Sequence, residues 1–218
     1  QRESFFEGWS GEGQVGLSNS TGNSRNTGIS LGLSFEKNGI QWRHSFNATV
    51  DHSRNNGVVT KDRYFASWQS DYKFTKRAVA AGILSWESDR FAGFNNRFSE
   101  SLGIGYSLIR TDDMALSIQG GPALRQTDYL TGKTKNGVAG MAAVNYKWTI
   151  SPGLVLSQDA TFYGQSQDST LTSNTAVTVK LIGALSAQAS FFAQYESNPP
   201  GRLATTSTLS RLTLVYSF

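Results

Sequence analysis

Apolar and polar residues alternate along this chain from one end to the other. Residues 27–36 show the pattern clearly: odd positions from 29 to 35 hold isoleucine, leucine or phenylalanine, and even positions from 28 to 36 hold glycine, serine or glutamate. Side chains of a β-strand point alternately to its two faces, so each such segment has one apolar and one polar face. Helical periodicity is nearly absent, and the sequence therefore predicts an all-β protein.

About twelve alternating segments follow one another, separated by residues typical of turns. Asn38-Gly39 is a strong hairpin signal, and a turn is expected at residues 20–24. Short turns are expected after even-numbered segments and longer polar loops after odd-numbered ones, including loops beginning at Arg54 and spanning 131–137 and 165–174. Pro122 predicts a bulge or kink, because proline cannot donate to a strand ladder.

The last ten residues place Leu212, Leu214, Tyr216 and Phe218 on one face. A closing strand with a terminal aromatic residue is typical of bacterial outer-membrane barrels. Further aromatic residues on apolar faces fall into two groups at opposite strand ends, as anchoring at two membrane interfaces requires. The group near the short turns comprises Phe35, Trp42, Tyr72, Phe74, Tyr106, Tyr146, Trp148, Tyr216 and Phe218; the group near the longer loops comprises Tyr64, Trp86, Phe98, Phe162 and Tyr195.

The width of such a barrel indicates which face points outward. About twelve strands enclose too wide a space for these apolar side chains to fill, so the apolar face must meet lipid. No segment reaches the roughly 18 consecutive apolar residues of a membrane helix. We therefore expect a transmembrane antiparallel up-and-down β-barrel of about twelve strands, with residues 1–218 as one domain. Both termini should be periplasmic, with residues 1–7 as a lead-in, and the chain is interpreted as an outer-membrane protein whose export signal has been removed.

Several segments resemble motifs of a known family. They are residues 9–17 followed by Thr21-Gly22-Asn23-Ser24, then 87–91, 103–106, 121–125 and the closing 195–218. In this order they are similar to the YdiY-like salt-induced outer-membrane proteins, a domain-of-unknown-function family of Gram-negative bacteria. The resemblance implies an outer-membrane barrel associated with salt or osmotic stress, and it implies no catalytic residues.

Few residues suit catalysis or metal binding. The main enzymatic alternative is a barrel hydrolase resembling outer-membrane phospholipase A, in which a histidine activates a serine. His44 and His52 each precede a serine, but neighbours in a strand point to opposite faces. Two separate histidines and no cysteine make a zinc site improbable, and scattered basic residues speak against nucleic-acid binding. We therefore expect no enzyme activity, metal or cofactor.

The polar face predicts two groups of charged residues in the lumen. Near the longer loops the group is Asp51, Arg63, Glu87, Asp89, Arg97, Arg125 and Glu196. Near the short turns it is the basic set Arg43, Lys73, Lys147, Lys180 and Arg211, opposed by Glu36 and Asp71. The first group forms either a self-neutralising ion-pair network or a constriction that orients a polar solute. The excess of basic residues in the second group suggests a weak anion preference.

These patterns favour a narrow porin-like channel for ions or small polar, possibly anionic, solutes. The alternative is a non-conducting barrel with a structural or partner-binding role in the cell envelope. Membrane lipid, including lipopolysaccharide, is an expected partner of either, and the sequence identifies no protein partner.

Overall fold

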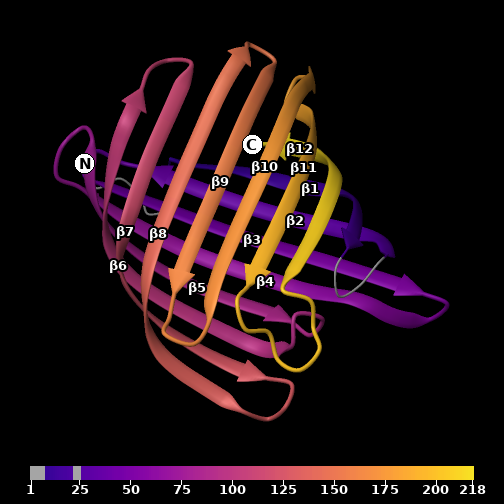
Figure 1. The fold of residues 1–218 in the computed structure, drawn as a ribbon. Coiled ribbons are helices and arrows are strands. Elements are labelled where there is room, and N and C mark those ends of the chain that lie inside the picture. Colours follow the sequence, from indigo (N-terminus) through magenta and orange to yellow (C-terminus); the bar gives the residue numbers. More distant parts are fainter. Residues whose placement is uncertain (1–7, 22–25) are drawn as a thin grey trace.

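The computed structural model describes residues 8–21 and 26–218, which form a closed barrel of antiparallel strands (Figure 1). The strands are β1 (Trp9–Thr21), β2 (Asn26–Asn38), β3 (Trp42–Asn55), β4 (Val58–Lys73), β5 (Ala78–Asp89), β6 (Phe94–Arg110), β7 (Met114–Tyr129), β8 (Thr134–Ser151), β9 (Leu154–Gly164), β10 (Ser169–Ile182), β11 (Leu185–Glu196) and β12 (Thr206–Ser217). Each pairs with its neighbour in sequence, and β12 pairs with β1. The predicted all-β, twelve-strand barrel is confirmed.

Residues 1–7, the predicted lead-in, and residues 22–24 of the predicted first turn lie outside the described part of the chain. Within residues 8–21 and 26–218, no helix is long and apolar enough to cross a membrane.

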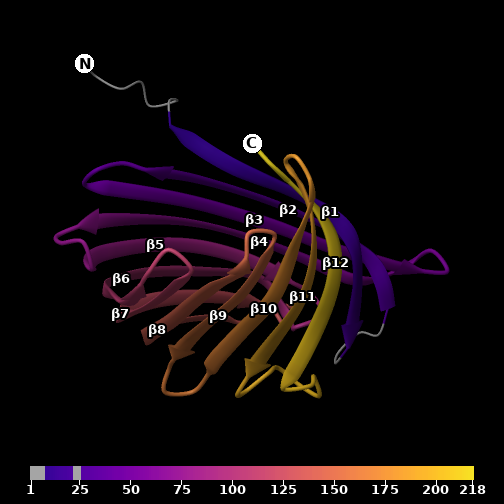
Figure 2. The ribbon, with the colours of Figure 1, turned by 90° about the horizontal axis from the view of Figure 1, so that it is seen from above.

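The barrel closes where β12 meets β1. Val15 lies opposite Leu214, and Leu17 lies opposite Leu212. At the end of this pairing, the Gly11 amide donates to the Phe218 carbonyl at 2.8 Å, and the Phe218 amide donates to the Gly11 carbonyl at 2.9 Å. The start of β1 and the end of β12 therefore lie side by side (Figure 2). Closure leaves no open sheet edge, which is a requirement for a β-structure surrounded by lipid.

The apolar residues face outward and the charged residues face the lumen. Leu31, Ile104 and Leu214 are 49%, 68% and 48% exposed on the outer surface, whereas Asp51 is fully buried. This arrangement is the reverse of a soluble barrel and matches a barrel whose outer face meets hydrocarbon. The expected orientation of the two faces is confirmed.

The connections divide between two ends of the barrel. We call the end with residues 39–41, 74–77, 111–113, 152–153 and 183–184 the turn end, and the end with residues 56–57, 90–93, 130–133, 165–168 and 197–205 the loop end. The start of β1, at Gly11, and the end of β12, at Phe218, both lie at the turn end.

Three predicted loops are wrong, because strands extend into them. At the first, Asn56 and Gly57 have φ angles of 47° and 81° and make a two-residue hairpin turn instead of a longer loop. At the other two, β8 already begins at Thr134 and β10 at Ser169. In the last of these stretches Thr170, Thr172 and Asn174 face the lumen, so a polar run that resembles a loop in the sequence belongs to a strand. Among the described loop-end connections, only residues 197–205 are long.

Of the bulge or kink predicted at Pro122, the bulge is wrong. The register between β6 and β7 is the same on both sides of it, with Ser101 opposite Ala123 and Ile104 opposite Gly120. The two strands approach closely here: a Cβ atom on Gly121 would lie 2.1 Å from the Leu102 carbonyl oxygen. Glycine opposite the neighbouring backbone thus accommodates the proline without an extra residue.

Aromatic side chains gather on the outer surface at the turn end. Trp42 packs against Tyr72 with ring centroids 5.1 Å apart, and Tyr72 packs against Phe74 at 5.3 Å. Across the seam, Phe35 and Phe218 lie 5.8 Å apart with their rings edge to face. This belt agrees with the predicted aromatic anchor at a membrane interface.

The outward orientation predicts how the barrel tolerates charge. Arginine at position 104 would face hydrocarbon, so Ile104→Arg should reduce the free energy of folding into a bilayer by about 2–4 kcal/mol. Asn47 lines the lumen and is exposed there, so Asn47→Arg should have little effect. Urea titration of folding into lipid vesicles measures the folding free energy of each variant. Equal losses for the two variants would contradict the assignment of the faces.

Candidate functional site in the lumen

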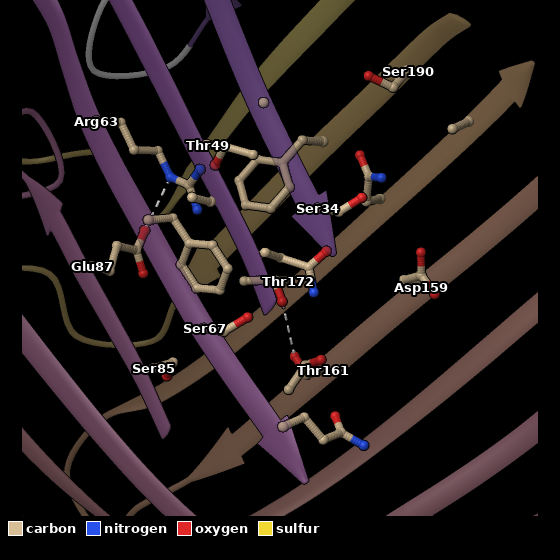
Figure 3. A pocket seen from close by; sticks show the side chains of 18 of the residues that line it. Ser34, Thr49, Arg63, Ser67, Ser85, Glu87, Asp159, Thr161, Thr172 and Ser190 are labelled. Atoms are coloured by element: carbon tan, nitrogen blue, oxygen red, sulfur yellow. Dashed lines mark hydrogen bonds and ion pairs between the residues drawn. The ribbon is translucent and has the colours of Figure 1, made fainter. Parts of the chain in front are cut away.

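The lumen contains a chamber of about 530 Å³. Most of its lining side chains carry hydroxyl or amide groups, and Figure 3 shows Ser34, Thr49, Ser67, Thr161 and Thr172 around one shared space. The chamber reaches from Glu12, near the turn end of β1, to Arg63, Arg97 and Arg125 toward the loop end. Such a lining can replace the water around a small polar solute with protein hydrogen bonds.

Three aromatic side chains also line the chamber: Phe65, Tyr163 and Phe192. The sequence analysis missed them, although each follows another aromatic residue. In the pairs Tyr64-Phe65, Phe162-Tyr163 and Phe191-Phe192, the first ring is exposed on the outer surface and the second points inward. Adjacent strand residues face opposite sides, so an aromatic pair in a barrel strand must place one ring in the lumen.

A chain of ion pairs begins at Asp51, which is fully buried. Arg211 of β12 donates to both carboxylate oxygens of Asp51, from Nε at 2.9 Å and from Nη2 at 2.6 Å. Arg63 of β4 lies 3.6 Å from the same carboxylate and donates to Glu87 of β5 at 3.1 Å. The guanidinium of Arg63 also stacks 4.6 Å from the ring centroid of Phe192 in β11. Strands from opposite parts of the wall thus meet through Arg63.

A second pair crosses the lumen between β6 and β11. Arg97 Nη1 donates to Glu196 Oε1 at 2.6 Å, although β7 to β10 separate their strands along the wall. Glu196 also accepts hydrogen bonds from Thr170 at 2.9 Å and Gln194 at 3.0 Å. Arg97 stacks 4.1 Å above the Phe94 ring, which is fully buried. The loop end of the lumen is therefore packed at this level.

Two further charged residues, Lys61 and Asp168, join this region. Lys61 donates to Asp89 at 3.0 Å, and Asp89 also accepts from the backbone amides of Phe91 and Ala92, which shapes the β5–β6 connection. Asp168, in the 165–168 connection, accepts from the Tyr129 hydroxyl at 3.2 Å and lies 3.9 Å from Arg97. Burial and the nearby Glu196 carboxylate raise the pKa of Asp168 above its usual value, although Arg97 and Arg125 act in the opposite direction.

The structure brings together the first group predicted from the sequence. Six of its members take part in ion pairs: Asp51, Arg63, Glu87, Asp89, Arg97 and Glu196. The seventh, Arg125, donates to the Thr170 hydroxyl at 2.9 Å and has no ion pair with any described residue. Lys61 and Asp168 were missed because the sequence analysis placed both in loops.

The second predicted group does not act as one basic cluster. Arg43 pairs with the buried Asp71, with Nε 2.9 Å from the carboxylate, and Lys73 donates to the Gly39 carbonyl in the neighbouring turn at 2.7 Å. Lys147 and Lys180 are exposed, with no ion pair to a described residue.

Arg211 belongs with the loop-end group, not with the basic set in which the sequence analysis placed it. The row of paired residues through Asp51 passes Ser30 and Gly16 and reaches β12 at Thr213. Arg211 is the next inward residue along β12. The tilt of the strands therefore brings its guanidinium to Asp51, a relation that position within a strand alone does not reveal.

His44 meets a serine that the sequence analysis did not consider. It lies opposite Ser70 in β4, with Nδ1 2.8 Å from the Ser70 hydroxyl, and Trp68 Nε1 donates to the same hydroxyl at 3.0 Å. Trp42 stacks on His44 with ring centroids 6.0 Å apart. No carboxylate of the described chain orients His44, and the contacts satisfy polar atoms on the outward face. In residues 8–21 and 26–218, no three potential metal-ligating side chains form a cluster.

The comparisons with known proteins agree with this architecture. A family model described as "Protein of unknown function, DUF481" matches residues 13–218. The chain belongs to this family. A curated relative from Escherichia coli (strain K12), "Uncharacterized protein YdiY", is 22% identical over 195 residues, covering 89% of this chain and 76% of the relative. The resemblance identified from the sequence motifs is confirmed.

Two solved structures with a similar fold are porins. The NanC porin superposes with a TM-score of 0.63 at 10% identity, covering 94% of this chain and 98% of that one. The KdgM porin in complex with disordered oligogalacturonate superposes with a TM-score of 0.52 at 14% identity, covering 94% and 99%. At these identities the likeness establishes the fold alone, that of a closed antiparallel outer-membrane β-barrel.

The cross-lumen pair predicts a large effect on stability. Glu196→Gln leaves the buried Arg97 guanidinium without its main counter-charge and should cost about 3–5 kcal/mol of unfolding free energy. Lys147→Gln also removes one charge, but at an exposed site, and should stay within about 0.5 kcal/mol of the parent. Urea unfolding in lipid vesicles provides the measurement. If the two variants are equally stable, the pair does not hold the barrel wall.

Proposed function

We propose that the barrel is a narrow channel for ions or small polar solutes, with the loop-end ion pairs as its constriction. The observation that carries the proposal is the polar chamber, which ends toward the loop end where Arg97 and Glu196 meet across the lumen. Charged groups on opposite walls of a narrow lumen impose an orientation on a passing solute. The proposal is one of transport rather than catalysis.

A preference for anions is part of the proposal. The chamber wall carries Arg63, Arg97, Arg125 and Arg211 toward the loop end, and the KdgM porin of similar fold has been solved with oligogalacturonate, an anionic ligand. Glu12 and Asp159 line the rest of the chamber and oppose this preference. We therefore expect weak anion selectivity rather than exclusion of cations.

The second candidate function is a non-conducting barrel with a structural or partner-binding role in the cell envelope. The dense loop-end network supports it, because Asp51, Asp89 and Phe94 are almost completely buried there. Conductance distinguishes the two candidates.

The setting of the barrel is also proposed. Family resemblance supports a role under salt or osmotic stress and a location in a bacterial outer membrane that contains lipopolysaccharide. By analogy with other outer-membrane barrels, the turn end and both termini would face the periplasm.

In planar bilayers we expect discrete current steps with a reversal potential that shows a small anion preference in a salt gradient. Removing both members of the constriction pair, in Arg97→Ser with Glu196→Ser, should enlarge the steps; the Asp168 carboxylate, 3.9 Å from Arg97, then keeps only its hydrogen bond from Tyr129 among the described residues. Arg43→Ser with Asp71→Ser removes an ion pair nearer the turn end and serves as the matched control. Absence of steps in all three proteins would support the non-conducting alternative, and clear cation selectivity would contradict the anion preference.

The chain has no cysteine, so its orientation can be tested by single-cysteine labelling. Arg202→Cys lies in the exposed 197–205 connection at the loop end, and Lys76→Cys lies in an exposed turn at the turn end. With a membrane-impermeant maleimide on intact cells, the first variant should label and the second should not. The opposite pattern would place the loop end in the periplasm.

A further inference from the structure

We propose that Arg125 is the anion-binding residue of the chamber and that its ligand is a small hydroxylated organic acid held through the carboxylate. This inference rests on the proposed channel function and names the class of solute that the channel would recognise. It follows from the partners of Arg125, the free edge of its guanidinium and the lining that leads to it.

Arg125 is a buried cation without a counter-ion. The Arg125 residue lines the chamber but is only 3% exposed. Among the described residues, no carboxylate oxygen lies within 4.0 Å of a guanidinium nitrogen of Arg125, the distance that defines an ion pair. By contrast, Lys61, Arg63, Arg97 and Arg211 each have a carboxylate partner. Glu196, Asp168 and Glu87 act on Arg125 only from beyond contact distance, and Arg97 repels it. A buried charge without a contacting counter-ion is costly, so an anion that enters the chamber gains by binding here.

The guanidinium keeps the edge that suits a carboxylate. Nη1 donates to Thr170 at 2.9 Å, whereas Nε is buried and has no hydrogen-bond partner within the described chain. The structure records no partner for Nη2 either. Nε and Nη2 form one side of the guanidinium fork, and two parallel N–H bonds from that side match the two oxygens of a carboxylate once the side chains that cover Nε move aside. The Tyr163 ring packs against the guanidinium, with its centroid 5.0 Å from the guanidinium carbon.

A row of small polar residues leads along the wall to Arg125. Successive paired positions are Ser34 and Asn47, then Asn47 and Ser67, Ser67 and Ser85, Ser85 and Ser99, and finally Ser99 and Arg125. All of them line the chamber. Because the strands are tilted, this row rises from β2 toward the loop end at β7. Hydroxyl and amide groups at each step can exchange hydrogen bonds with the hydroxyls of a solute whose carboxylate reaches Arg125.

Nearer the turn end, the chamber carries a charge that disfavours a second anionic group. Asp159 lies on the same face of β9 as Tyr163, four residues away, a separation of about 13 Å along the strand. Its recorded partner is the Asn145 amide, at 2.7 Å, rather than a cation. A solute with a single carboxylate therefore fits the chamber better than one with acidic groups at both ends.

The test uses gluconate as the probe, with sorbitol as its neutral counterpart and acetate as a carboxylate without hydroxyl groups. Binding is measured on the full chain in detergent micelles as a ligand-dependent rise in unfolding temperature, which requires no conduction. We expect gluconate to stabilise the parent protein more than acetate at equal concentration, and sorbitol to have little effect. Arg125→Gln should weaken gluconate binding about 10- to 100-fold, since it removes two charge-assisted hydrogen bonds.

Lys147→Gln is the matched control, because it removes one positive charge from an exposed position and should leave gluconate binding unchanged. Arg125→Lys keeps the charge but not the forked edge of the guanidinium, so it should fold and bind gluconate only weakly. This variant tests the role of Arg125 even if Arg125→Gln fails to fold. Undiminished gluconate binding in the Arg125 variants would overturn the assignment of this residue. Equal stabilisation by acetate and gluconate would overturn the hydroxylated class of ligand.

Planar-bilayer recordings separate this inference from the proposed function. Gluconate binding that depends on Arg125 in a protein without current steps would support the binding site and refute the channel. Current steps together with no gluconate binding would support the channel and refute the binding site.

Discussion

The structure depends on the difference between the two environments of each strand: hydrocarbon on the outward face and a polar lumen on the inward face. Outward side chains such as Ile104 face hydrocarbon, and inward side chains such as Ser67 face a polar chamber. Because the period of a strand is two residues, a register shift by one would exchange the faces and place serine and arginine in lipid. The regular alternation therefore fixes the register of all twelve strands, and the closed backbone ladder satisfies the peptide groups in a medium without water.

The charged residues have a different role from the apolar ones. Buried ion pairs add little net stability, because the cost of removing both partners from water offsets their attraction. What they determine here is the shape of the lumen: Arg97 and Glu196 connect opposite walls, and Arg211 and Asp51 connect strands on both sides of the seam. The packed loop end and the open chamber are two results of where these pairs form, and Arg125 differs from the other arginines because it has no such pair.

The fold could be predicted almost completely from the sequence, since alternation depends on local pattern alone. The extent of loops could not, because a strand whose lumen face is polar, as at Thr170, Thr172 and Asn174, resembles a loop in the sequence. Lys61 was absent from the predicted lumen for the same reason, whereas Asp168 lies in a connection whose approach to Arg97 no local pattern shows. The loop-end charged group was largely predictable, but the basic group near the short turns was not. The partner of Arg211 depends on strand tilt, and the unpartnered edge of Arg125 depends on side-chain geometry that no spacing encodes.

The seam between β1 and β12 also determines the order of assembly. Residues about 200 positions apart must find each other there, whereas every other strand pairs with its immediate neighbour. Contacts between distant residues carry the largest loss of chain entropy and form late. Until Leu212 and Leu214 reach Leu17 and Val15, the sheet has two unpaired edges that can recruit other chains. The period before this last pairing is therefore when a nascent barrel is most open to aggregation and most dependent on assistance.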